Sequence, residues 1–268
     1  MQYSNQLQLA LKASLCAGRH IMEIYESENF EINFKTDDSP LTKADIASNK
    51  VLINTLSKSN LPIISEESKN ESYQIRKSWK SLWIIDPIDG TKEFIKRNGE
   101  FTVNVALIKD NNPVLGIVYA PFTKELYFAE HGFGAFKVEN ISYFDQLQNL
   151  QIIDLRNSNQ LLPKTFTLVL SRSHMNRETK HYVNKMKIEH GLVASKFYGS
   201  SLKICKVAEG YAHCYPRFGP TMEWDTAAAH AVATYAGCKM IDVENSESLL
   251  YNKESLLNPF FLVTRDTK

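Results

Sequence analysis

Apolar side chains recur every three or four positions over residues 7–25, the spacing of one face of an α-helix. The apolar face is made by Leu7, Ala10, Leu11, Leu15, Gly18, Ile21, Met22 and Tyr25. A second amphipathic helix is expected after Thr42, a residue type that often caps helix N-termini. Its apolar side chains are Ala44, Ile46, Ala47, Val51, Leu52 and Leu56. Both segments are predicted to lie against a hydrophobic core.

Short apolar runs predict strands in the rest of the first half. Residues 31–35 alternate between polar and apolar, and residues 61–64 and 82–85 form continuous apolar runs typical of buried strands. We expect Pro87 and Gly90 to end the last of these and to lead into a new helix. Four further runs, separated by turns, predict an antiparallel meander over residues 101–108, 114–119, 126–129 and 134–138.

A polar, weakly patterned stretch over residues 140–164 is predicted to link two halves of the chain. Beyond it, strands and helices alternate. Strands are expected at 165–170, 192–198, 212–215 and 238–243, the last as the final strand, and helices at 176–190, 200–209 and 223–236. The pattern therefore predicts an α+β part over residues 1–145 and an α/β part over residues 146–268.

Composition narrows the class of protein. At 268 residues with 43% hydrophobic content, the chain is long enough for a large core. Its net charge of +1 gives no field that would favour a nucleic-acid polymer or an anionic membrane. The four cysteines are far apart in sequence, so we expect reduced, buried thiols. No segment predicts a leader or a membrane span, which favours the cytoplasm; peripheral attachment to the inner membrane stays open, as does the choice between monomer and homodimer.

The candidate chemistry begins where the apolar run at residues 82–85 ends in two acids, Asp86 and Asp89. Carboxylates beside buried residues need cations, and oxygen ligands suit hard metal ions. The N–H groups of Gly90 and Thr91 could receive a phosphate. The alternative is that Asp89 only caps a helix and Asp86 only pairs with a lysine. The run at 61–64 also ends in acids, and the two ends would share a site if the strands are adjacent.

Other polar residues have weaker signals when taken alone. Asp45 lies in the first turn of its predicted helix, where a negative charge simply complements the helix dipole. His174 follows a strand end with Ser171, and an isolated histidine is more often structural than catalytic. Lys203 lies in a helix that opens near Ser200. Asp225 begins an alanine-rich helix after a rigid loop and can face both the helix and a cation.

Three stretches together resemble the metal-binding signatures of the inositol monophosphatase superfamily. They are Leu61-Pro62-Ile63-Ile64-Ser65-Glu66-Glu67, Trp83-Ile84-Ile85-Asp86-Pro87-Ile88-Asp89-Gly90-Thr91 and Glu223-Trp224-Asp225-Thr226-Ala227-Ala228. Two longer stretches, residues 90–104 and 215–225, resemble more narrowly the CysQ-type 3'(2'),5'-bisphosphate nucleotidases. The order and spacing match, and the likeness covers nearly the whole chain.

The resemblance implies a layered αβαβα sandwich, with most metal ligands in the first part and the substrate pocket and last ligand in the second. Metal ligation is implied for Glu66, Asp86, Asp89, Asp225 and the carbonyl of Ile88, and catalytic roles for Asp45, Thr91 and Glu66. Asp45 and Thr91 match the pair that orients the attacking water, which overrides the helix-dipole interpretation of Asp45. Substrate contacts are implied for Glu66, Ile88, Asp89, Gly90, Thr91, Ser171, His174, Ser200, Lys203 and Asp225.

The implied activity is a Mg²⁺-dependent phosphatase that converts adenosine 3',5'-bisphosphate, a by-product of sulfur metabolism, to AMP and phosphate. Two or three Mg²⁺ ions and inhibition by Li⁺ are expected. Four carboxylates balance two divalent cations, and oxygen-only ligands suit Mg²⁺ rather than zinc. The sulfated relative of this nucleotide stays open as a second substrate.

Two alternatives remain. The first has the same chemistry but acts on inositol monophosphate or another sugar phosphate. The second is a nucleotide sensor without catalysis, which would tolerate loss of a metal ligand, whereas this chain retains every one of them. A kinase of the P-loop type is disfavoured because the sequence has no G-x-x-x-x-G-K-[ST] motif.

Overall fold

The computed structural model describes residues 3–27, 32–34, 40–172 and 175–265. Within these residues the chain forms a seven-stranded sheet, a five-stranded sheet and a small antiparallel pair of β1 (Asn33–Phe34) and β2 (Pro40–Leu41). The larger sheet contains, in spatial order, β3 (Ile63–Ser65), β4 (Ser81–Asp89), β5 (Thr102–Lys109), β6 (Asn112–Ala120), β7 (Glu125–Glu130), β8 (Gly134–Val138) and β9 (Ile152–Asp154). The smaller contains β11 (Val193–Tyr198), β10 (Phe166–Ser171), β12 (Cys214–Arg217), β14 (Phe261–Thr264) and β13 (Lys239–Asp242).

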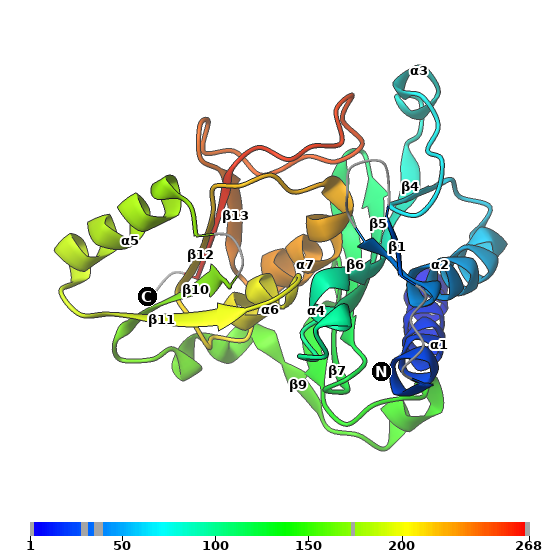
Figure 1. Cartoon of the computed structure of the whole chain (residues 1–268), viewed down its shortest axis with the longest axis horizontal. Helices are drawn as coiled ribbons and strands as arrows, with labels where there is room; N and C mark the ends of the chain where they lie inside the picture. The colour runs from blue at the N-terminus through cyan, green and yellow to red at the C-terminus, as the bar shows by residue number, and fades with distance from the viewer. Residues whose placement is uncertain (1–2, 28–31, 35–39, 173–174, 266–268) are drawn as a thin grey trace.

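Helices cover the sheets in layers (Figure 1). Helices α1 (Asn5–Ser27) and α2 (Lys43–Leu56) pack on the outer face of the larger sheet, and α6 (Leu202–Ala208) and α7 (Glu223–Tyr235) lie between the sheets. Helix α5 (Arg177–His190) packs on the outer side of the smaller sheet. The short helical segments are α3 (Tyr73–Arg76), α4 (Thr91–Ile95) and the 3-10 turns at Ser57–Ser59, Phe144–Gln148 and Leu155–Leu161. This order confirms the predicted αβαβα sandwich.

Strand β4 shows how the layers are held together, because both of its faces are buried. Leu82 and Ile84 belong to the core that contains α6 and α7, whereas Trp83 and Ile85 belong to the core beneath α1 and α2. Side chains alternate across a strand, so one continuous apolar run can serve two cores. The strand therefore lies between the two hydrophobic cores.

Proline does not end β4 as expected. The strand continues through Pro87 to Asp89, with an irregular register against β5 between Asp86 and Asp89. Its ladder with β3 stops at Ile85. Proline lacks an N–H, and a strand tolerates it where that edge has no partner to receive a hydrogen bond. The irregularity lets the two aspartates leave the regular alternation of the sheet.

The last strand was also missed. The run at 238–243 was expected to be final, but β14 follows it and pairs antiparallel with both β12 and β13. The continuous apolar run at residues 260–263 is the sequence signal that indicates this strand. The polar stretch at 140–164 is partly ordered, because it contains β9, which pairs with β8. The seven-stranded sheet thus includes a strand that lies after residue 145. The division of the chain into two parts at residue 145 stays a prediction.

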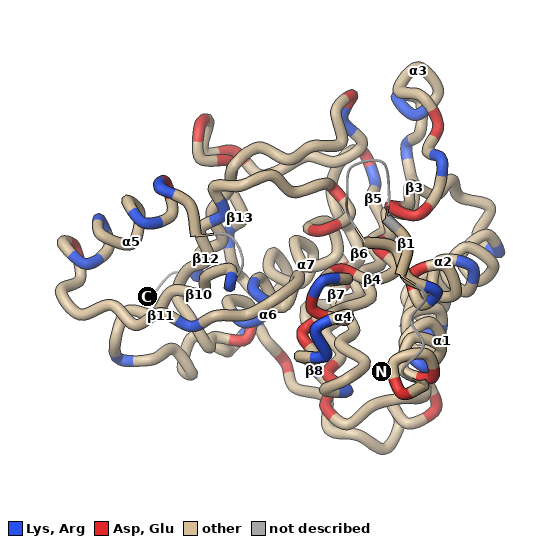
Figure 2. The backbone as a smooth tube through the Cα atoms, viewed as in Figure 1, with Lys and Arg blue, Asp and Glu red and all other residues tan. Residues whose placement is uncertain are grey.

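Charged side chains of both signs are interspersed along the elements, as α5 illustrates (Figure 2). No helix in the described part of the chain is long and apolar enough to cross a membrane. All four cysteines are free thiols; Cys205, Cys214 and Cys238 are buried and Cys16 is partly buried.

Candidate metal and phosphate site

Two strand ends bring the acidic residues together. Strands β3 and β4 are adjacent and parallel, so both end at the same edge of the sheet. Glu66 follows β3 directly, and its N–H donates to the carbonyl of Ile85 at 3.3 Å. Asp86 and Asp89 lie in the C-terminal part of β4. The two acidic ends are therefore adjacent, which is the condition under which they can share a site.

Asp86 lies at the centre of the cluster and is only 1% exposed. Its Oδ1 accepts a hydrogen bond from the N–H of Ile88 at 3.0 Å. Its Oδ2 is buried and meets no hydrogen-bond donor among the residues that the structure describes. Carboxylate oxygens of Asp86, Glu66 and Asp225 all lie within 4.8 Å of one another. Burial and the neighbouring acids, Glu66 first, hold the pKa of Asp86 well above its usual range.

Asp225 comes from the other half of the chain, at the third position of α7. Its Oδ2 accepts from the N–H of Met222 at 2.8 Å, which caps the helix. Burial raises the pKa of Asp225 to about 8, and the charge of Asp89 adds to that rise. One oxygen of the carboxylate is thus occupied by the helix end while the group stays beside Glu66 and Asp86.

Asp45 is placed in the same way at the third position of α2. Thr42 donates to its Oδ2 from the backbone N–H at 2.7 Å and from the hydroxyl at 2.6 Å. Its Oδ1 accepts from the Thr91 hydroxyl at 3.2 Å. Asp45 therefore completes a capping box at the start of α2, where its negative charge also complements the helix dipole. It contacts Thr91 as well. Burial raises the pKa of Asp45, and the bonds from Thr42 oppose the rise.

Thr91 begins α4 directly after Gly90, whose φ of 95° favours glycine. A Cβ on Gly90 would lie 3.0 Å from the backbone oxygen of Glu100. The Thr91 hydroxyl lies 3.3 Å from the carbonyl of Ile88 as well as near Asp45. The turn therefore directs one hydroxyl between a buried acid and a main-chain carbonyl that is itself a predicted ligand.

Asp89 and Lys203 connect the two halves of the site. Burial raises the pKa of Asp89 to about 6, against the opposing charge of Lys203 and a hydrogen bond from the Ser201 backbone. Lys203 is 8% exposed and donates to the carbonyl of Ser200 at 2.5 Å. Burial lowers the pKa of Lys203 to about 8. The ammonium group thus lies beside the acids yet is poorly solvated, as an anion-binding lysine would be.

The donor set fits a hard divalent cation. It consists of carboxylates and the Ile88 carbonyl, so all ligands are oxygen, as Mg²⁺ prefers. The buried Oδ2 of Asp86 lacks a donor among the described residues, and a buried carboxylate oxygen without one is costly. A cation between Glu66, Asp86 and Asp225 would satisfy it.

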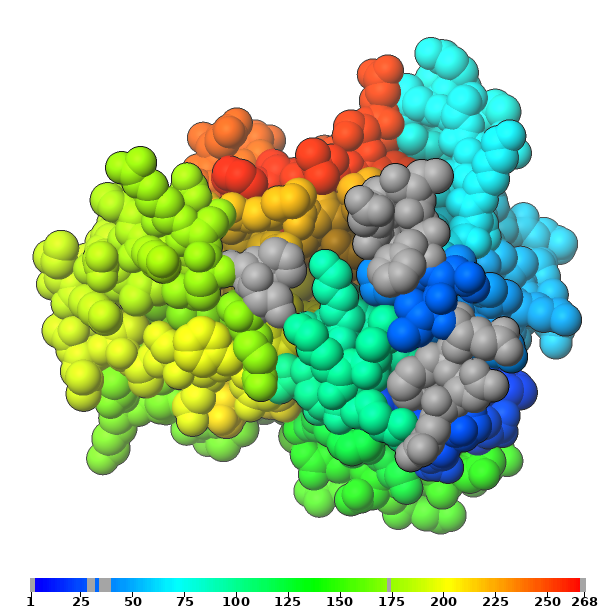
Figure 3. All heavy atoms as spheres, in the orientation of Figure 1, coloured from blue at the N-terminus to red at the C-terminus, as the bar shows by residue number. Residues whose placement is uncertain are grey.

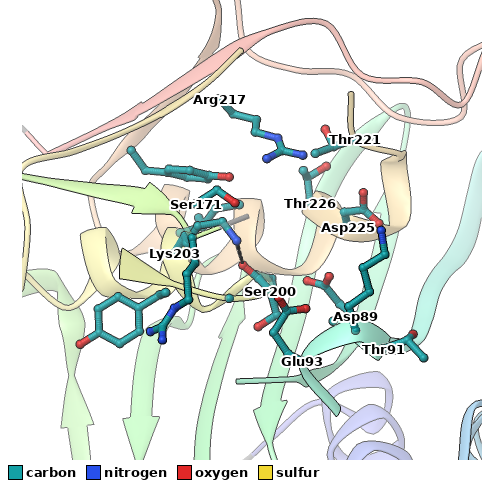
Figure 4. A pocket seen from close by; sticks show the side chains of 18 of the residues that line it. Asp89, Thr91, Glu93, Ser171, Ser200, Lys203, Arg217, Thr221, Asp225 and Thr226 are labelled. Atoms are coloured by element: carbon teal, nitrogen blue, oxygen red, sulfur yellow. Dashed lines mark hydrogen bonds between the residues drawn. The ribbon is translucent and has the colours of Figure 1, made fainter. Parts of the chain in front are cut away.

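A cavity of about 260 Å³ adjoins the acids. Its lining includes the expected Glu66, Asp89, Gly90, Thr91, Ser171, Ser200, Lys203 and Asp225. Figure 4 shows Lys203 and Arg217 on the side of the pocket across from Asp89 and Thr91. Asp86, Ile88 and Asp45 are not part of this lining, and His174 lies outside the described residues. In Figure 3, α4 faces the segments of the second half across the middle of the molecule.

Several lining residues were not predicted as contacts: Glu93, Arg172, Tyr198, Tyr215 and Arg217. Arg217 is the most informative. Its Nη2 donates to the carbonyl of Pro220 at 2.8 Å, whereas its buried Nε has no hydrogen-bond partner in the described part of the chain. It lies in the 215–225 stretch that carried the resemblance, so the signal was present in the sequence.

A sequence profile of the inositol monophosphatase family matches residues 3–264. The chain belongs to the inositol monophosphatase family. Within this family, it is 44% identical over 251 residues to a 3'(2'),5'-bisphosphate nucleotidase CysQ of Salmonella typhimurium, covering 92% of this chain and 95% of that protein. It is 43% identical, with the same coverage, to the protein of that name in Escherichia coli K12.

Solved structures of family members have the same fold. The crystal structure of CysQ from Bacteroides thetaiotaomicron matches with a TM-score of 0.89 and 44% identity, covering 99% of this chain and 98% of that one. A more distant structure, an IMPase/NADP phosphatase complexed with Mg²⁺ and phosphate, matches with a TM-score of 0.71 at 20% identity over 92% and 85% of the two chains. At that identity the second match supports the fold alone.

Proposed function

We propose that this protein is a Mg²⁺-dependent phosphatase that hydrolyses the 3'-phosphate of adenosine 3',5'-bisphosphate to give AMP and phosphate. The convergence of Glu66, Asp86 and Asp225 carries the metal-dependent chemistry, together with the buried Oδ2 of Asp86, which has no hydrogen-bond donor among the described residues. The nucleotide specificity is supported by relatives named 3'(2'),5'-bisphosphate nucleotidases at 43–44% identity over nearly the whole chain.

The acids would hold Mg²⁺, two or three ions in all, through Glu66, Asp86, Asp89, Asp225 and the Ile88 carbonyl. When bound, the metal supplies positive charge for the phosphoryl oxygens and the departing ribose oxygen. The chain prepares this role by keeping the ligands in place before the metal arrives. Asp86 and Asp225 each accept a hydrogen bond from a backbone N–H, which limits rotation of their carboxylates.

Asp45 and Thr91 would position the attacking water. The Thr91 hydroxyl donates to Asp45, so its oxygen lone pairs can accept a hydrogen bond from water. The water oxygen then forms a bond to phosphorus as the bond to the ribose 3'-oxygen breaks. One proton of the water passes through the Thr91 hydroxyl to the Asp45 carboxylate. The ribose 3'-oxygen takes a proton from solvent water as it leaves as a hydroxyl, and Asp45 then returns its proton to solvent. Raised basicity of the buried Asp45 favours its acceptance of that proton.

Residues of the second half would bind the rest of the nucleotide. Lys203 and Arg217 both line the pocket, and their charges suit the 5'-phosphate. Ser171 and Ser200 lie in the same wall and can hydrogen-bond to the nucleoside. We also propose that the N–H groups of Gly90 and Thr91 face the phosphoryl oxygens, that Li⁺ inhibits, and that the sulfated relative of the substrate is accepted.

The nearest alternative is hydrolysis of inositol monophosphate or another sugar phosphate at the same acids. Lys203 and Arg217, two of the cationic side chains that line the pocket, favour a substrate with a second anionic group. A nucleotide sensor is disfavoured because Glu66, Asp86 and Asp225 converge and the Thr91 hydroxyl contacts Asp45.

The test is phosphate release by the purified protein with Mg²⁺, comparing adenosine 3',5'-bisphosphate with inositol 1-phosphate at equal concentration, with and without Li⁺. We expect strong preference for the nucleotide, and we expect Li⁺ to reduce its turnover. Preference for inositol 1-phosphate would overturn the substrate assignment while leaving the metal site intact. Absence of activity on both would favour the sensor.

A further inference from the structure

A buried acid outside the predicted ligand set lies two residues from Asp225. Glu223 is the first residue of α7 and is fully buried. Its Oε2 accepts from the N–H of Asn252 at 2.6 Å, and its Oε1 accepts from the N–H of Lys253 at 3.0 Å and from the Lys253 ammonium at 2.6 Å. Burying a carboxylate is costly unless it is fully hydrogen-bonded, and this one has a donor at each oxygen.

The partners of Glu223 belong to residues 249–258, which we call the C-terminal bracket. The bracket also contacts the start of α7 through main-chain groups. The Glu223 N–H donates to the carbonyl of Leu256 at 2.9 Å, and the Asn258 side chain donates to the carbonyl of Met222 at 2.7 Å. Met222 is the residue whose N–H binds the Asp225 carboxylate. The bracket therefore fixes the turn on which that carboxylate depends.

The other side of the bracket is held by Arg76 of α3, which follows the Glu66 loop in sequence. Arg76 is 4% exposed and exchanges two hydrogen bonds with the Asn252 side chain, each 2.8 Å long. Its Nε donates to the carbonyl of Glu71 at 3.0 Å. Figure 1 shows α3 beside the loops of the C-terminal region. Buried hydrogen bonds thus connect the segment after Glu66 with the helix that carries Asp225.

We propose that Glu223 is a positioning residue that sets the distance between the Asp225 and Glu66 carboxylates. Without a fixed bracket, mutual repulsion of the acids would move the start of α7 away from β3 and β4. The inference rests on the proposed function, because it assigns these two carboxylates to one metal site. It predicts that the bracket controls metal affinity more than the rate of the metal-loaded enzyme.

The experiment measures Mg²⁺ binding by calorimetry, together with the Mg²⁺ dependence of nucleotide hydrolysis, in Glu223→Gln and Asn252→Ala. A glutamine cannot accept both backbone N–H groups, and Asn252→Ala removes both side-chain bonds to Arg76 without touching α7. We expect the Kd for Mg²⁺ to rise about tenfold in each, the usual scale for outer residues that orient metal ligands. At saturating Mg²⁺, kcat should recover to within about threefold of the unaltered protein.

The matched control is Val138→Ala, a loss of buried volume in the core beneath α1 and α2. It should lower the thermal midpoint but leave the Kd for Mg²⁺ unchanged. Asn252→Ala leaves the Glu223 side chain unchanged and serves as the second test if Glu223→Gln does not fold. An unchanged Kd for Mg²⁺ in Asn252→Ala would overturn the proposal. If the unaltered protein binds Mg²⁺ and hydrolyses the nucleotide, such a result overturns only the positioning role of Glu223. If the unaltered protein binds no Mg²⁺, the proposed function fails as well.

Discussion

Three aspartates of the site, Asp45, Asp86 and Asp225, share one arrangement of their carboxylates. Each gives one oxygen to a backbone N–H within three residues: Thr42, Ile88 and Met222 respectively. That bond removes rotational freedom, so the second oxygen points in a fixed direction before any ligand binds. Preorganisation of this kind lowers the cost of ordering the site during the reaction. This arrangement costs stability, because the three carboxylates repel one another and burial disfavours their charged forms.

The substitution Asp86→Asn should separate these two effects. The introduced amide oxygen can still accept from the Ile88 N–H, but the substitution removes one negative charge from the cluster. We expect the thermal midpoint in EDTA at pH 8 to rise, because the raised pKa of Asp86 reflects destabilisation of its charged form. Turnover should fall on the order of 10³-fold, as when a group that stabilises developing charge is lost. Thermal denaturation and phosphate release measure the two; near-normal turnover would contradict the ligand assignment.

Helix α7 connects the elements of the site through unusually close packing. It lies between the two sheets, and its alanines pack against β6. A Cβ on Gly116 of β6 would lie 2.1 Å from the backbone oxygen of Ala228, so only glycine allows this approach. Because Asp225 lies in the first turn of the same helix, the depth at which α7 packs decides where that carboxylate lies relative to β4.

Gly116→Ala should therefore push α7 away from the sheet. We expect a loss of about 1–3 kcal/mol in the free energy of unfolding, the usual cost of overpacking. Weaker binding of Mg²⁺ should accompany it. Gly219→Ala is the matched control, because its added methyl would come no closer than 3.7 Å to Arg217. Chemical denaturation measures the stability difference, and equal stability of the two variants would refute the argument from close packing.

For the molecule as a whole, the acids couple folding to pH and to metal. In the folded protein the pKa of Asp225 is raised to about 8 and that of Asp89 to about 6, and the pKa of Asp86 is also held well above its usual range. An unfolded aspartate titrates near a pKa of about 3.9. Between these values the folded state binds more protons than the unfolded state, so the free energy of unfolding decreases as pH rises.

We therefore expect the metal-free protein to lose stability steadily from about pH 4 to pH 8. Mg²⁺ competes with those protons and should remove most of the slope, so that its stabilising effect is larger at about pH 8 than at about pH 5.5. Thermal midpoints at several pH values, with EDTA or with Mg²⁺, measure this. A metal-free midpoint that instead rose toward pH 8 would mean that the acids are not forced together in the folded chain.

Local pattern was sufficient for much of the fold. The periodicity of residues 7–25 defines α1, the apolar run at 82–85 defines the buried part of β4, and the meander follows from alternation and turns. Each depends on side chains a few positions apart. Pattern was insufficient where the pairing between strands decides the extent of a strand. An edge without a partner allowed β4 to continue through Pro87. The position of β14 is fixed by two neighbouring strands that are distant in sequence.

The same division holds for the site. The residue pattern was enough to indicate which acids end apolar strands, since a buried carboxylate beside a strand needs a cation wherever the strand lies. Folding of the whole chain was required to bring Asp45 to Thr91, Asp225 to Glu66 and Asp86, and Arg217 into the wall of the same pocket. These groups are separated by many residues, so their distances depend on how helices and sheets pack and not on the order of residues along the chain.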